Sequence, residues 1–327
     1  MRLLSILLIY IMFTPLYGKD ANSIGNEIRE QSKQLLLNKQ FTALNKMSHR
    51  FVEKQSRLPD GRWKITFMSF LGDLDKNNSK TSFERNMSLV NEWIKETPNA
   101  PLAYLTKAKL WISYAFVARG ERYAHSVPKD KWPIFYERIR RAREVLETSK
   151  VITQDHPVFY TTMISIAKLQ GWREEELRTI YDRGTSKFPG YYFIYFYVAD
   201  YYLPRWQGSK QKLREFVEDA VERSKKQEGM TLYARIYWYL KWALYVRTFQ
   251  PGNAEWPKMK QGFTRIMKDY PNSTWNLNSF AFYACLAEDW KKGKELLARI
   301  KKPNMAIWGD KHMVASCMEE RGVKIDY

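Results

Sequence analysis

Apolar residues recur along this chain at the three- and four-residue spacing that places them on one face of a helix. The stretch that ends before Pro98 is an example, with Phe83, Met87, Val90 and Ile94 on one side. Similar stripes run along most of the chain, and no segment shows the strict alternation of a half-buried strand. The pattern therefore predicts an all-α protein.

Prolines, glycines and polar turns divide this pattern into separate helices. Leu58-Pro59-Asp60-Gly61 is the strongest turn signal in its part of the chain. Thr81 and Glu84 have the spacing of a capping box, which predicts that a helix starts there. The chain from Tyr191 to Leu203 is apolar on nearly all sides, so we expect it to be buried between neighbouring helices. The expected helices are two within 22–55, then 63–74, 81–97, 103–119, 134–152, 157–170, 174–184, 191–203, 213–221, 231–246, 257–270, 274–286, 291–300 and 311–320.

Two helices share a further signature, an aromatic residue followed eight positions later by a proline. It occurs at Tyr181 with Pro189 and at Phe263 with Pro271. A proline cannot continue a helix and disfavours the α conformation in the residue before it, so each step ends one helix and begins another. Helices connected in this way stack as hairpins, and we expect one helical-repeat domain over residues 19–327.

The aromatic-to-proline step resembles that of the tetratricopeptide repeat, whose length is close to the 32 residues between Pro157 and Pro189. Leu177 and Met259 stand where that repeat has a small residue, so we expect looser helix packing there. The resemblance implies a TPR-like helical-hairpin solenoid, an alpha-alpha superhelix. A related helical-repeat variant is the alternative for individual repeats. Stacks of this kind are scaffolds whose surfaces bind other molecules.

Three other stretches resemble a bacterial family known only as a domain of unknown function. The resemblance covers roughly residues 100–320 and implies a helical-repeat fold with no established activity. It rests on Ala118-Arg119-Gly120 with Tyr123 and Trp132, on Trp275-Asn276-Leu277-Asn278 with Phe280, and on Ala284-Cys285 with Trp308-Gly309.

Residues 1–18 have the organisation of a secretory signal peptide. Arg2 precedes an apolar run from Leu3 to Phe13, and the stretch ends at the small residue Gly18. The run is shorter than the roughly 20 residues that a membrane-spanning helix needs, so we expect cleavage after Gly18. An uncleaved inner-membrane anchor is the alternative. The mature chain would be exported, periplasmic or secreted, from a bacterial cell, with no transmembrane segment after signal cleavage.

Charge narrows the range of partners. The chain has 54 basic and 35 acidic residues, a formal net charge of +19; removing residues 1–18, which hold one arginine and no acid, leaves +18. The basic residues form short clusters, such as Lys291-Lys292-Gly293-Lys294, that acids separate. An exported protein meets little nucleic acid, so we expect no nucleic-acid partner. A solvated basic surface, with weak contact with the anionic envelope surface as the alternative, fits the charge better.

No strong catalytic or metal-binding motif occurs in the sequence. It has no P-loop, no G-x-S-x-G, no H-E-x-x-H and no paired C-x-x-C. A metal site needs ligands that converge, whereas the four histidines are scattered singly, as His49, His125, His156 and His312. We therefore expect no metal, no cofactor and no catalytic residues.

The connection from Arg119 to Trp132 is long for two packed helices, and long ordered loops are often functional. It also contains Tyr123 and His125. A cation beside aromatic rings can contact a peptide or an anion, so these four residues are candidates for ligand binding. A packed structural loop is the alternative.

The densest group of aromatic residues carries two charges, Asp200 and Arg205. The rings either pack in the core or line a groove for sugars or an extended peptide. Asp200 and Arg205 either pair with each other or with tyrosine hydroxyls, or act as polar anchors in a ligand pocket. The aromatic residues are Tyr191, Tyr192, Phe193, Tyr195, Phe196, Tyr197, Tyr201, Tyr202 and Trp206.

Cys285 and Cys317 are the two cysteines of the chain. An exported chain with two cysteines tends to pair them, because oxidising compartments permit it. Cys285 lies in a predicted helix, and a turn at Pro303 would bring the terminal helix with Cys317 back against it. We expect a disulfide at this end of the stack; two buried free thiols are the alternative.

These observations favour an exported, non-enzymatic scaffold that holds a peptide or protein partner on a concave helical-repeat surface in the cell envelope. One alternative is an enzyme of unknown class with a pocket near Arg119, His125 and Trp132. Another is a secreted factor that acts on another cell. A deep pocket with convergent polar groups would favour the enzyme, and a long open groove would favour the scaffold.

Overall fold

The structure is a computed structural model, and it describes residues 20–73, 79–120, 124–206, 208–309 and 311–320. These residues lie in helices, turns and connections, and their one β contact is an isolated bridge between Arg57 and Trp63. The predicted all-α fold is therefore confirmed for the described part of the chain. No helix within it is both long enough and apolar enough to cross a membrane. The expected signal peptide, residues 1–18, lies outside the described residues.

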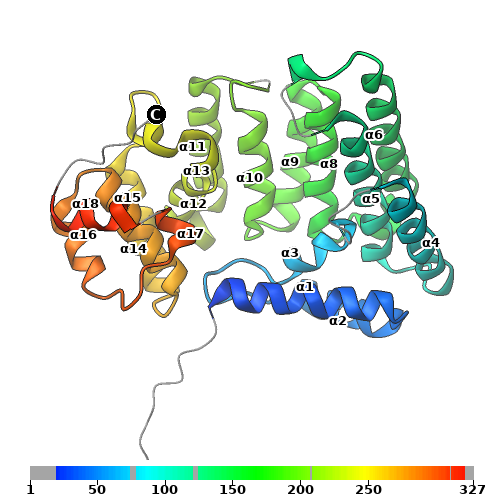
Figure 1. Ribbon diagram of the computed structural model, residues 1–327, viewed down its shortest axis with the longest axis horizontal. Coiled ribbons are helices and arrows are strands. Elements are labelled where there is room, and N and C mark those ends of the chain that lie inside the picture. Colours follow the sequence, from blue (N-terminus) through cyan, green and yellow to red (C-terminus); the bar gives the residue numbers. More distant parts are fainter. Residues whose placement is uncertain (1–19, 74–78, 121–123, 207, 310, 321–327) are drawn as a thin grey trace, which may run out of the picture.

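Helices follow one another along the chain with short connections (Figure 1). In the described residues the α-helices and the short 3-10 helices (η) are α1 (Ala21–Leu37), α2 (Phe41–Glu53), α3 (Ile65–Met68), η1 (Ser69–Asp73), α4 (Lys80–Glu96), α5 (Pro101–Arg119), η2 (Ala124–Ser126), α6 (Lys131–Thr148), α7 (Lys150–Thr153), α8 (Pro157–Gln170), α9 (Glu174–Lys187), α10 (Tyr192–Tyr201), α11 (Lys210–Glu228), α12 (Thr231–Tyr239), α13 (Lys241–Leu244), η3 (Tyr245–Phe249), α14 (Trp256–Asp269), α15 (Thr274–Leu286), α16 (Trp290–Leu297), α17 (Met305–Trp308) and α18 (Lys311–Met318).

The helices from α5 to α12 stand side by side in chain order, with α4 at one end of the row and the group from α14 to α18 at the other (Figure 1). Consecutive members of the row pack on one another, as α5 does on α6 and α11 on α12. The first helix, α1, lies across the ends of this row, and α3 lies between α1 and the row (Figure 1). The N-terminal helices therefore join parts of the row that are far apart in sequence.

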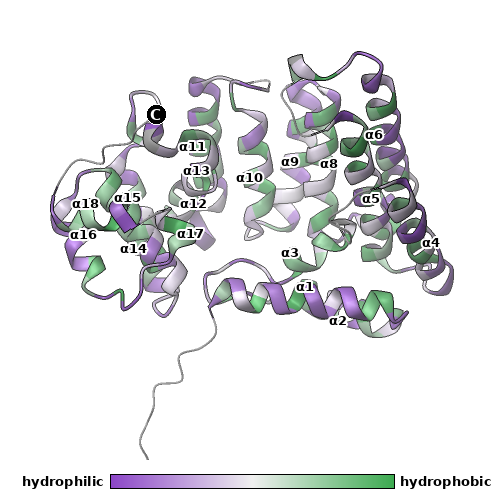
Figure 2. Ribbon diagram, viewed as in Figure 1, coloured by the Kyte–Doolittle hydropathy of each residue, from purple (hydrophilic) through white to green (hydrophobic). Residues whose placement is uncertain are grey.

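Burial follows the predicted hydrophobic pattern. The outer helices, such as α6 and α11, carry hydrophilic and hydrophobic residues around one ribbon (Figure 2). By contrast, α10 contacts α8, α9, α11 and α12, and its residues Tyr192, Tyr195 and Val198 are almost completely inaccessible to solvent. The expectation that this aromatic-rich segment is buried between neighbours is confirmed.

Several predicted helix boundaries were wrong. Helix α4 begins at Lys80, and its cap is Ser79, whose hydroxyl oxygen accepts a hydrogen bond from the Ser82 backbone N–H at 3.1 Å. The proposed capping box of Thr81 and Glu84 therefore lies inside the helix. The segment predicted as one helix over 231–246 is α12, α13 and η3. Helix α13 ends before Tyr245, which adopts a positive φ of 38° that an α-helix cannot contain.

The helices approach closely at two glycines near the aromatic-to-proline steps. A Cβ atom on Gly184 of α9 would lie 2.8 Å from the Tyr160 ring of α8. A Cβ atom on Gly262 of α14 would lie 2.5 Å from the backbone oxygen of Met230. Small residues at these positions therefore bring the helices together, while the looser packing expected around Leu177 and Met259 stays a prediction.

Within the C-terminal group of helices, Cys285 of α15 and Cys317 of α18 form a disulfide with their Cα atoms 5.4 Å apart. Helix α16 packs between them, and a Cβ atom on its Gly293 would lie 2.9 Å from the Cys285 sulfur. The absence of a side chain at Gly293 thus lets α16 lie against the sulfur pair. The predicted pairing of the two cysteines agrees with this geometry.

Candidate binding pocket

The structure brings together two of the four candidates in the loop after α5. The Arg119 guanidinium carbon lies 5.4 Å from the centre of the Trp132 ring and within 6 Å of the Phe116 and Phe135 rings. One of its N–H groups donates to the Gly120 carbonyl at 3.1 Å. Arg119 is therefore packed on aromatic rings, where cation–π attraction holds it in place.

The structure describes less of the other two candidates, Tyr123 and His125. Tyr123 lies outside the described residues. His125 is in the short helix η2, and its side chain also lies outside the described residues. The Arg119 and Trp132 contact is thus the part of this candidate site that the structure resolves.

Asp200 belongs to the buried interior. The residue is 7% exposed, and one carboxylate oxygen accepts hydrogen bonds from the Lys168 ammonium at 3.2 Å and from the Tyr239 hydroxyl at 3.0 Å. Burial and the Asp200 carboxylate together raise the pKa of Tyr239, which keeps its hydroxyl protonated and able to donate. Asp200 therefore links α8, α10 and α12. Two partners were expected for Asp200, Arg205 or a tyrosine hydroxyl, and the structure shows the hydroxyl of Tyr239.

Arg205 lies in the exposed turn after α10. Its guanidinium carbon is 3.9 Å from the centre of the Trp242 ring, and Trp242 is 49% exposed. An arginine that stacks on a ring keeps the N–H groups at its edge free to bind an anion. Arg205 also lines a pocket of about 280 Å³ between the turn after α10, the first turn of α11 and the segment 243–253.

We call this hollow the Arg205 pocket. Leucines and an alanine form its floor, and three cations, Arg205, Lys210 and Arg247, stand around it as exposed side chains. No acidic residue of the described chain lines the pocket. The complete lining is Leu203, Pro204, Arg205, Lys210, Leu213, Ala243, Leu244, Arg247, Gln250 and Asn253.

The electrostatic character of the Arg205 pocket is set by cations that lack acidic partners. Elsewhere on the surface, arginines pair with acids one helical turn away, as Arg140 does with Glu137. Arg205, Lys210 and Arg247 form no ion pair with any described residue. Lys210 is also the first residue of α11, and the start of a helix attracts negative charge. The pocket is therefore suited to an anionic group attached to an apolar one.

The wall of the pocket is fixed by its own hydrogen bonds. The Asn253 amide nitrogen donates to the Arg247 carbonyl at 2.6 Å, and the Ala254 N–H donates to the Thr248 carbonyl at 2.9 Å. Gly252, which has a positive φ of 85°, allows the sharp turn between them. The floor residues Leu203 and Leu213 belong to the buried core. A pocket built in this way needs little reorganisation to accept a ligand.

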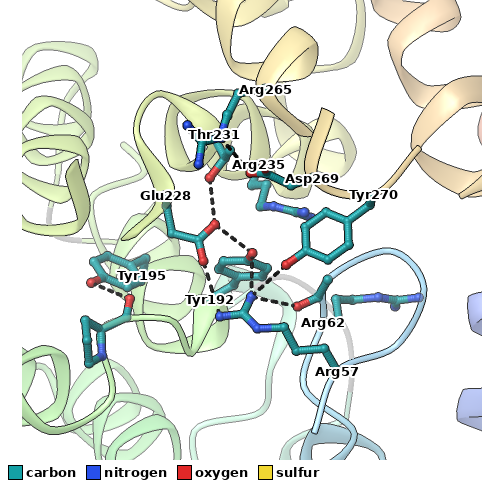
Figure 3. A network of polar contacts seen from close by, with 12 residues as sticks. Arg57, Arg62, Tyr192, Tyr195, Glu228, Thr231, Arg235, Arg265, Asp269 and Tyr270 are labelled. Atoms are coloured by element: carbon teal, nitrogen blue, oxygen red, sulfur yellow. Dashed lines mark hydrogen bonds and ion pairs between the residues drawn. The ribbon is translucent and has the colours of Figure 1, made fainter. Parts of the chain in front are cut away.

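A second polar region, which the sequence did not reveal, lies around Arg57 (Figure 3). Glu228 is 5% exposed and accepts hydrogen bonds from the Tyr192 hydroxyl at 2.8 Å and the Thr231 hydroxyl at 2.9 Å. The Arg57 guanidinium lies 3.3 Å from its other oxygen and donates to the hydroxyls of Tyr192 at 2.8 Å and Tyr270 at 3.2 Å. We call these five residues the Arg57 cluster.

The charged side chains of the Arg57 cluster all have ion-pair or hydrogen-bond partners. Burial alone would lower the pKa of Arg57, but the nearby Tyr192 and Glu228 outweigh it and the pKa is raised. Burial raises the pKa of Tyr192 well above its usual range, so its hydroxyl donates to Glu228 and accepts from Arg57. Each of the charged groups thus has its partners, which is the arrangement that buried charges require.

The loop that contains Arg57 makes a second set of contacts with the helix row. The Asp60 carbonyl accepts from the Arg235 guanidinium at 2.9 Å and the Asn276 amide at 3.4 Å, while Arg62 donates to the Asp60 carboxylate at 2.6 Å. Gly61 has a positive φ of 95°, and a Cβ atom there would lie 2.7 Å from the Tyr270 ring. The turn predicted at Leu58–Gly61 exists, and its backbone is bound by α12 and α15. We call residues 57–62 the docked loop.

The described residues offer no group of three or more histidine, cysteine, aspartate or glutamate side chains placed to hold a metal ion. The buried His156 has a structural role. Burial, and then the charge of Lys109, lower its pKa to about 3, so the ring is neutral. Its Nδ1 accepts from the Val158 N–H at 3.3 Å, which caps α8, and its Nε2 lies 3.3 Å from the Ser48 hydroxyl.

Comparison with known proteins does not identify a relative. Neither a protein-family model, nor a curated protein, nor a solved structure matches this chain. The resemblances to the tetratricopeptide repeat and to a bacterial family of unknown function therefore stay predictions from the residues that carry them.

Proposed function

We propose that this protein is an exported, non-enzymatic scaffold of TPR-like helical hairpins that binds a peptide or protein partner in the cell envelope, and that the Arg205 pocket is where the partner binds. The observation that carries the proposal is the set of three cations without acidic partners around an apolar floor. Unpaired charges beside apolar surface are typical of binding sites, because a protein gains nothing in stability from arranging them so.

Other contacts of the candidate residues support this choice of site. Arg119 is half-buried among three rings and donates to the Gly120 carbonyl, and one carboxylate oxygen of Asp200 accepts from Lys168 and Tyr239, so both side chains are held inside the fold. Arg205 is supported by Trp242 and exposed to solvent. The basic surface would also make weak contact with anionic envelope lipids, at an affinity that salt screening removes.

The experiment is a binding measurement with fluorescently labelled peptides. Mature protein beginning at Lys19 is titrated with acidic, neutral and basic peptides that each contain leucine or phenylalanine, at low and at physiological salt. We expect the acidic peptides to bind most tightly and to weaken as salt rises. The variant that combines Lys210→Gln and Arg247→Gln should lose this binding, whereas Lys226→Gln, on an exposed residue at the far end of α11, should keep it.

Two results would contradict the proposal. Equal affinity for acidic and basic peptides would show that the cations play no part in selection. Acidic peptides that bind the double variant as well as the unchanged protein would place the binding surface elsewhere. Export is tested separately, by N-terminal sequencing of the mature protein and by its distribution between soluble and membrane fractions.

A further inference from the structure

The Arg205 pocket places apolar and cationic groups within a single hollow of about 280 Å³. This volume is just below the range of about 300–1,000 Å³ that is usual for ligand pockets. A ligand that satisfies both kinds of group must therefore carry an apolar side chain and a negative charge within one or two residues. An extended internal segment of a peptide presents neighbouring side chains on opposite sides, which separates the two.

A free C-terminal residue meets this requirement directly, because its carboxylate is attached to the same Cα atom as its side chain. We propose that the Arg205 pocket binds the free C-terminal end of a partner protein, with an apolar last residue on the leucine floor and the terminal carboxylate against the cations. This inference rests on the proposed function and specifies the part of the partner that binds.

The geometry of the cations supports a terminal carboxylate. The Arg205 guanidinium carbon lies 3.9 Å from the centre of the Trp242 ring and the side chain is exposed, so its N–H groups are available for the two parallel hydrogen bonds that a carboxylate accepts. Lys210 begins α11, where the helix dipole favours negative charge, although the Ser209 hydroxyl already accepts from one N–H of the first turn, that of Lys212, at 3.1 Å. The Arg247 guanidinium donates to the Ala243 carbonyl at 3.1 Å, and both residues line the pocket.

The number of cations extends the inference to the residue before the last. A single carboxylate cannot neutralise three charges, and the excess favours a second acid close to the first. In an extended chain the side chain before the last one points away from it, so this second acid lies outside the apolar hollow, against the exposed ends of the cations. We therefore expect the preferred ligand to end in aspartate or glutamate followed by leucine or phenylalanine. A long fatty acid also joins a carboxylate to an apolar group, but a hollow of this size would leave most of its acyl chain in water.

The test compares two labelled hexapeptides of one sequence, Gly-Ser-Gly-Ser-Glu-Leu, one with a free C-terminal carboxylate and the other with a C-terminal amide. Both are titrated into mature protein at low salt. Removing a charge that accepts hydrogen bonds from arginine should weaken binding by about tenfold or more. A third peptide, in which the same glutamate and leucine lie in the middle and the end is amidated, should bind no better than the amide.

Variants assign the effect to the pocket. Arg205→Gln, Lys210→Gln and Arg247→Gln should each reduce the preference for the free carboxylate severalfold. Arg205→Lys should retain part of it, since a lysine keeps the charge but not the two-pronged geometry. Lys226→Gln, an equal loss of charge on the same helix, should leave the preference unchanged. All four altered side chains are exposed, and a thermal melt of each variant verifies that it is folded.

The outcomes separate this inference from the proposed function. Equal binding of the free and the amidated peptide, abolished by the pocket variants, would overturn the C-terminal preference and leave peptide binding at the pocket intact. No binding of any acidic peptide would overturn both. Displacement of the peptide by sodium laurate at lower concentration than by unlabelled peptide would overturn the peptide ligand in favour of a fatty acid.

Discussion

The Arg57 cluster and the Arg205 pocket each place arginine beside aromatic rings, but they differ in what surrounds the charge. Arg57 has a buried glutamate and two tyrosine hydroxyls within hydrogen-bonding distance, and it connects the docked loop to the helix row. Arg205 has a ring beneath it, two more cations across an apolar floor and no acid. A charge with all its partners holds the fold together, whereas a charge without partners is available to a ligand.

This difference has an energetic meaning. Removing one member of a buried ion pair leaves the other charge buried without compensation, which costs several kcal/mol. Removing an exposed cation from a group of like charges costs almost nothing and can relieve repulsion. The two regions should therefore respond in opposite ways to the same kind of substitution, and the predictions below test this, beginning with the largest effect.

Glu228→Ala should produce the largest loss of stability, about 3–5 kcal/mol in the free energy of unfolding, because it leaves the Arg57 guanidinium without its buried counter-charge. Urea unfolding measures the change. Glu222→Ala is the matched control on the same helix, since Glu222 is 73% exposed and pairs with Lys225 at the surface. Its effect should stay within about 0.5 kcal/mol. Equal effects at the two glutamates would show that the Arg57 cluster contributes nothing beyond a surface pair.

The disulfide gives the second largest effect and joins α15 to α18 by a covalent bond. Cys285 and Cys317 are 32 positions apart, and closing a loop of that length should contribute about 3–4 kcal/mol in the chain-entropy model. Replacing both by serine, or reducing the protein, should lower stability by that amount. A thiol reagent added to denatured, unreduced protein checks the pairing: two reactive thiols per chain would refute it.

Acid should destabilise the protein by protonating His156, a buried residue whose two ring nitrogens both have hydrogen-bond partners. Its folded-state pKa of about 3 lies below the ordinary value of 6.5, so the contribution of the neutral ring is full above pH 6.5 and is lost as the pH falls from 6.5 towards 3. Each pH unit in that window removes about 1.4 kcal/mol relative to a variant without the titration.

His156→Asn keeps a capping side chain at the start of α8 but cannot be protonated. Between pH 6 and pH 4.5 the unchanged protein should therefore lose about 2 kcal/mol more than the variant in urea unfolding. Parallel pH profiles for the two proteins would mean that the His156 ring becomes charged without cost in the folded state, in conflict with its burial.

How much of the structure could be predicted from the sequence depends on how far apart in the chain the interacting residues lie. Helical stripes, the burial of α10 and the turn at Leu58–Gly61 follow from neighbouring residues, and the sequence predicted them. The Arg57 cluster joins residues 135 and 213 positions apart, and no local pattern connects Arg57 with Tyr192 or Tyr270. The cap of α4 was assigned wrongly because Ser79, Thr81 and Ser82 are all capable of capping and lie within four positions.

The Arg205 pocket could be predicted from the sequence only in part. Asp200 and Arg205 are the two charges of an aromatic segment, which predicts a role for both. The structure separates them: Asp200 links buried helices, and Arg205 lies exposed over the Trp242 ring. Lys210 and Arg247 were missed, although the sequence holds a signal. Neither has an acid three or four positions away, whereas surface cations such as Arg140 have acids at that spacing. Cations without such neighbours are worth singling out as candidates for binding.

The smallest effect tests the comparison most sharply, because stability and binding should change in opposite directions. Lys210 occupies the first position of α11, where a positive charge opposes the helix dipole, and Lys226 lies in the last turn, where it is favourable. Lys210→Gln should therefore raise the free energy of unfolding by about 0.3–0.5 kcal/mol, and Lys226→Gln should lower it by a similar amount. In the peptide titration the order reverses, since Lys210→Gln should weaken binding and Lys226→Gln should not. A Lys210 variant that is less stable and binds peptide equally well would show that Lys210 stabilises the fold and does not bind the ligand. That result would contradict the contrast between the Arg57 cluster and the Arg205 pocket.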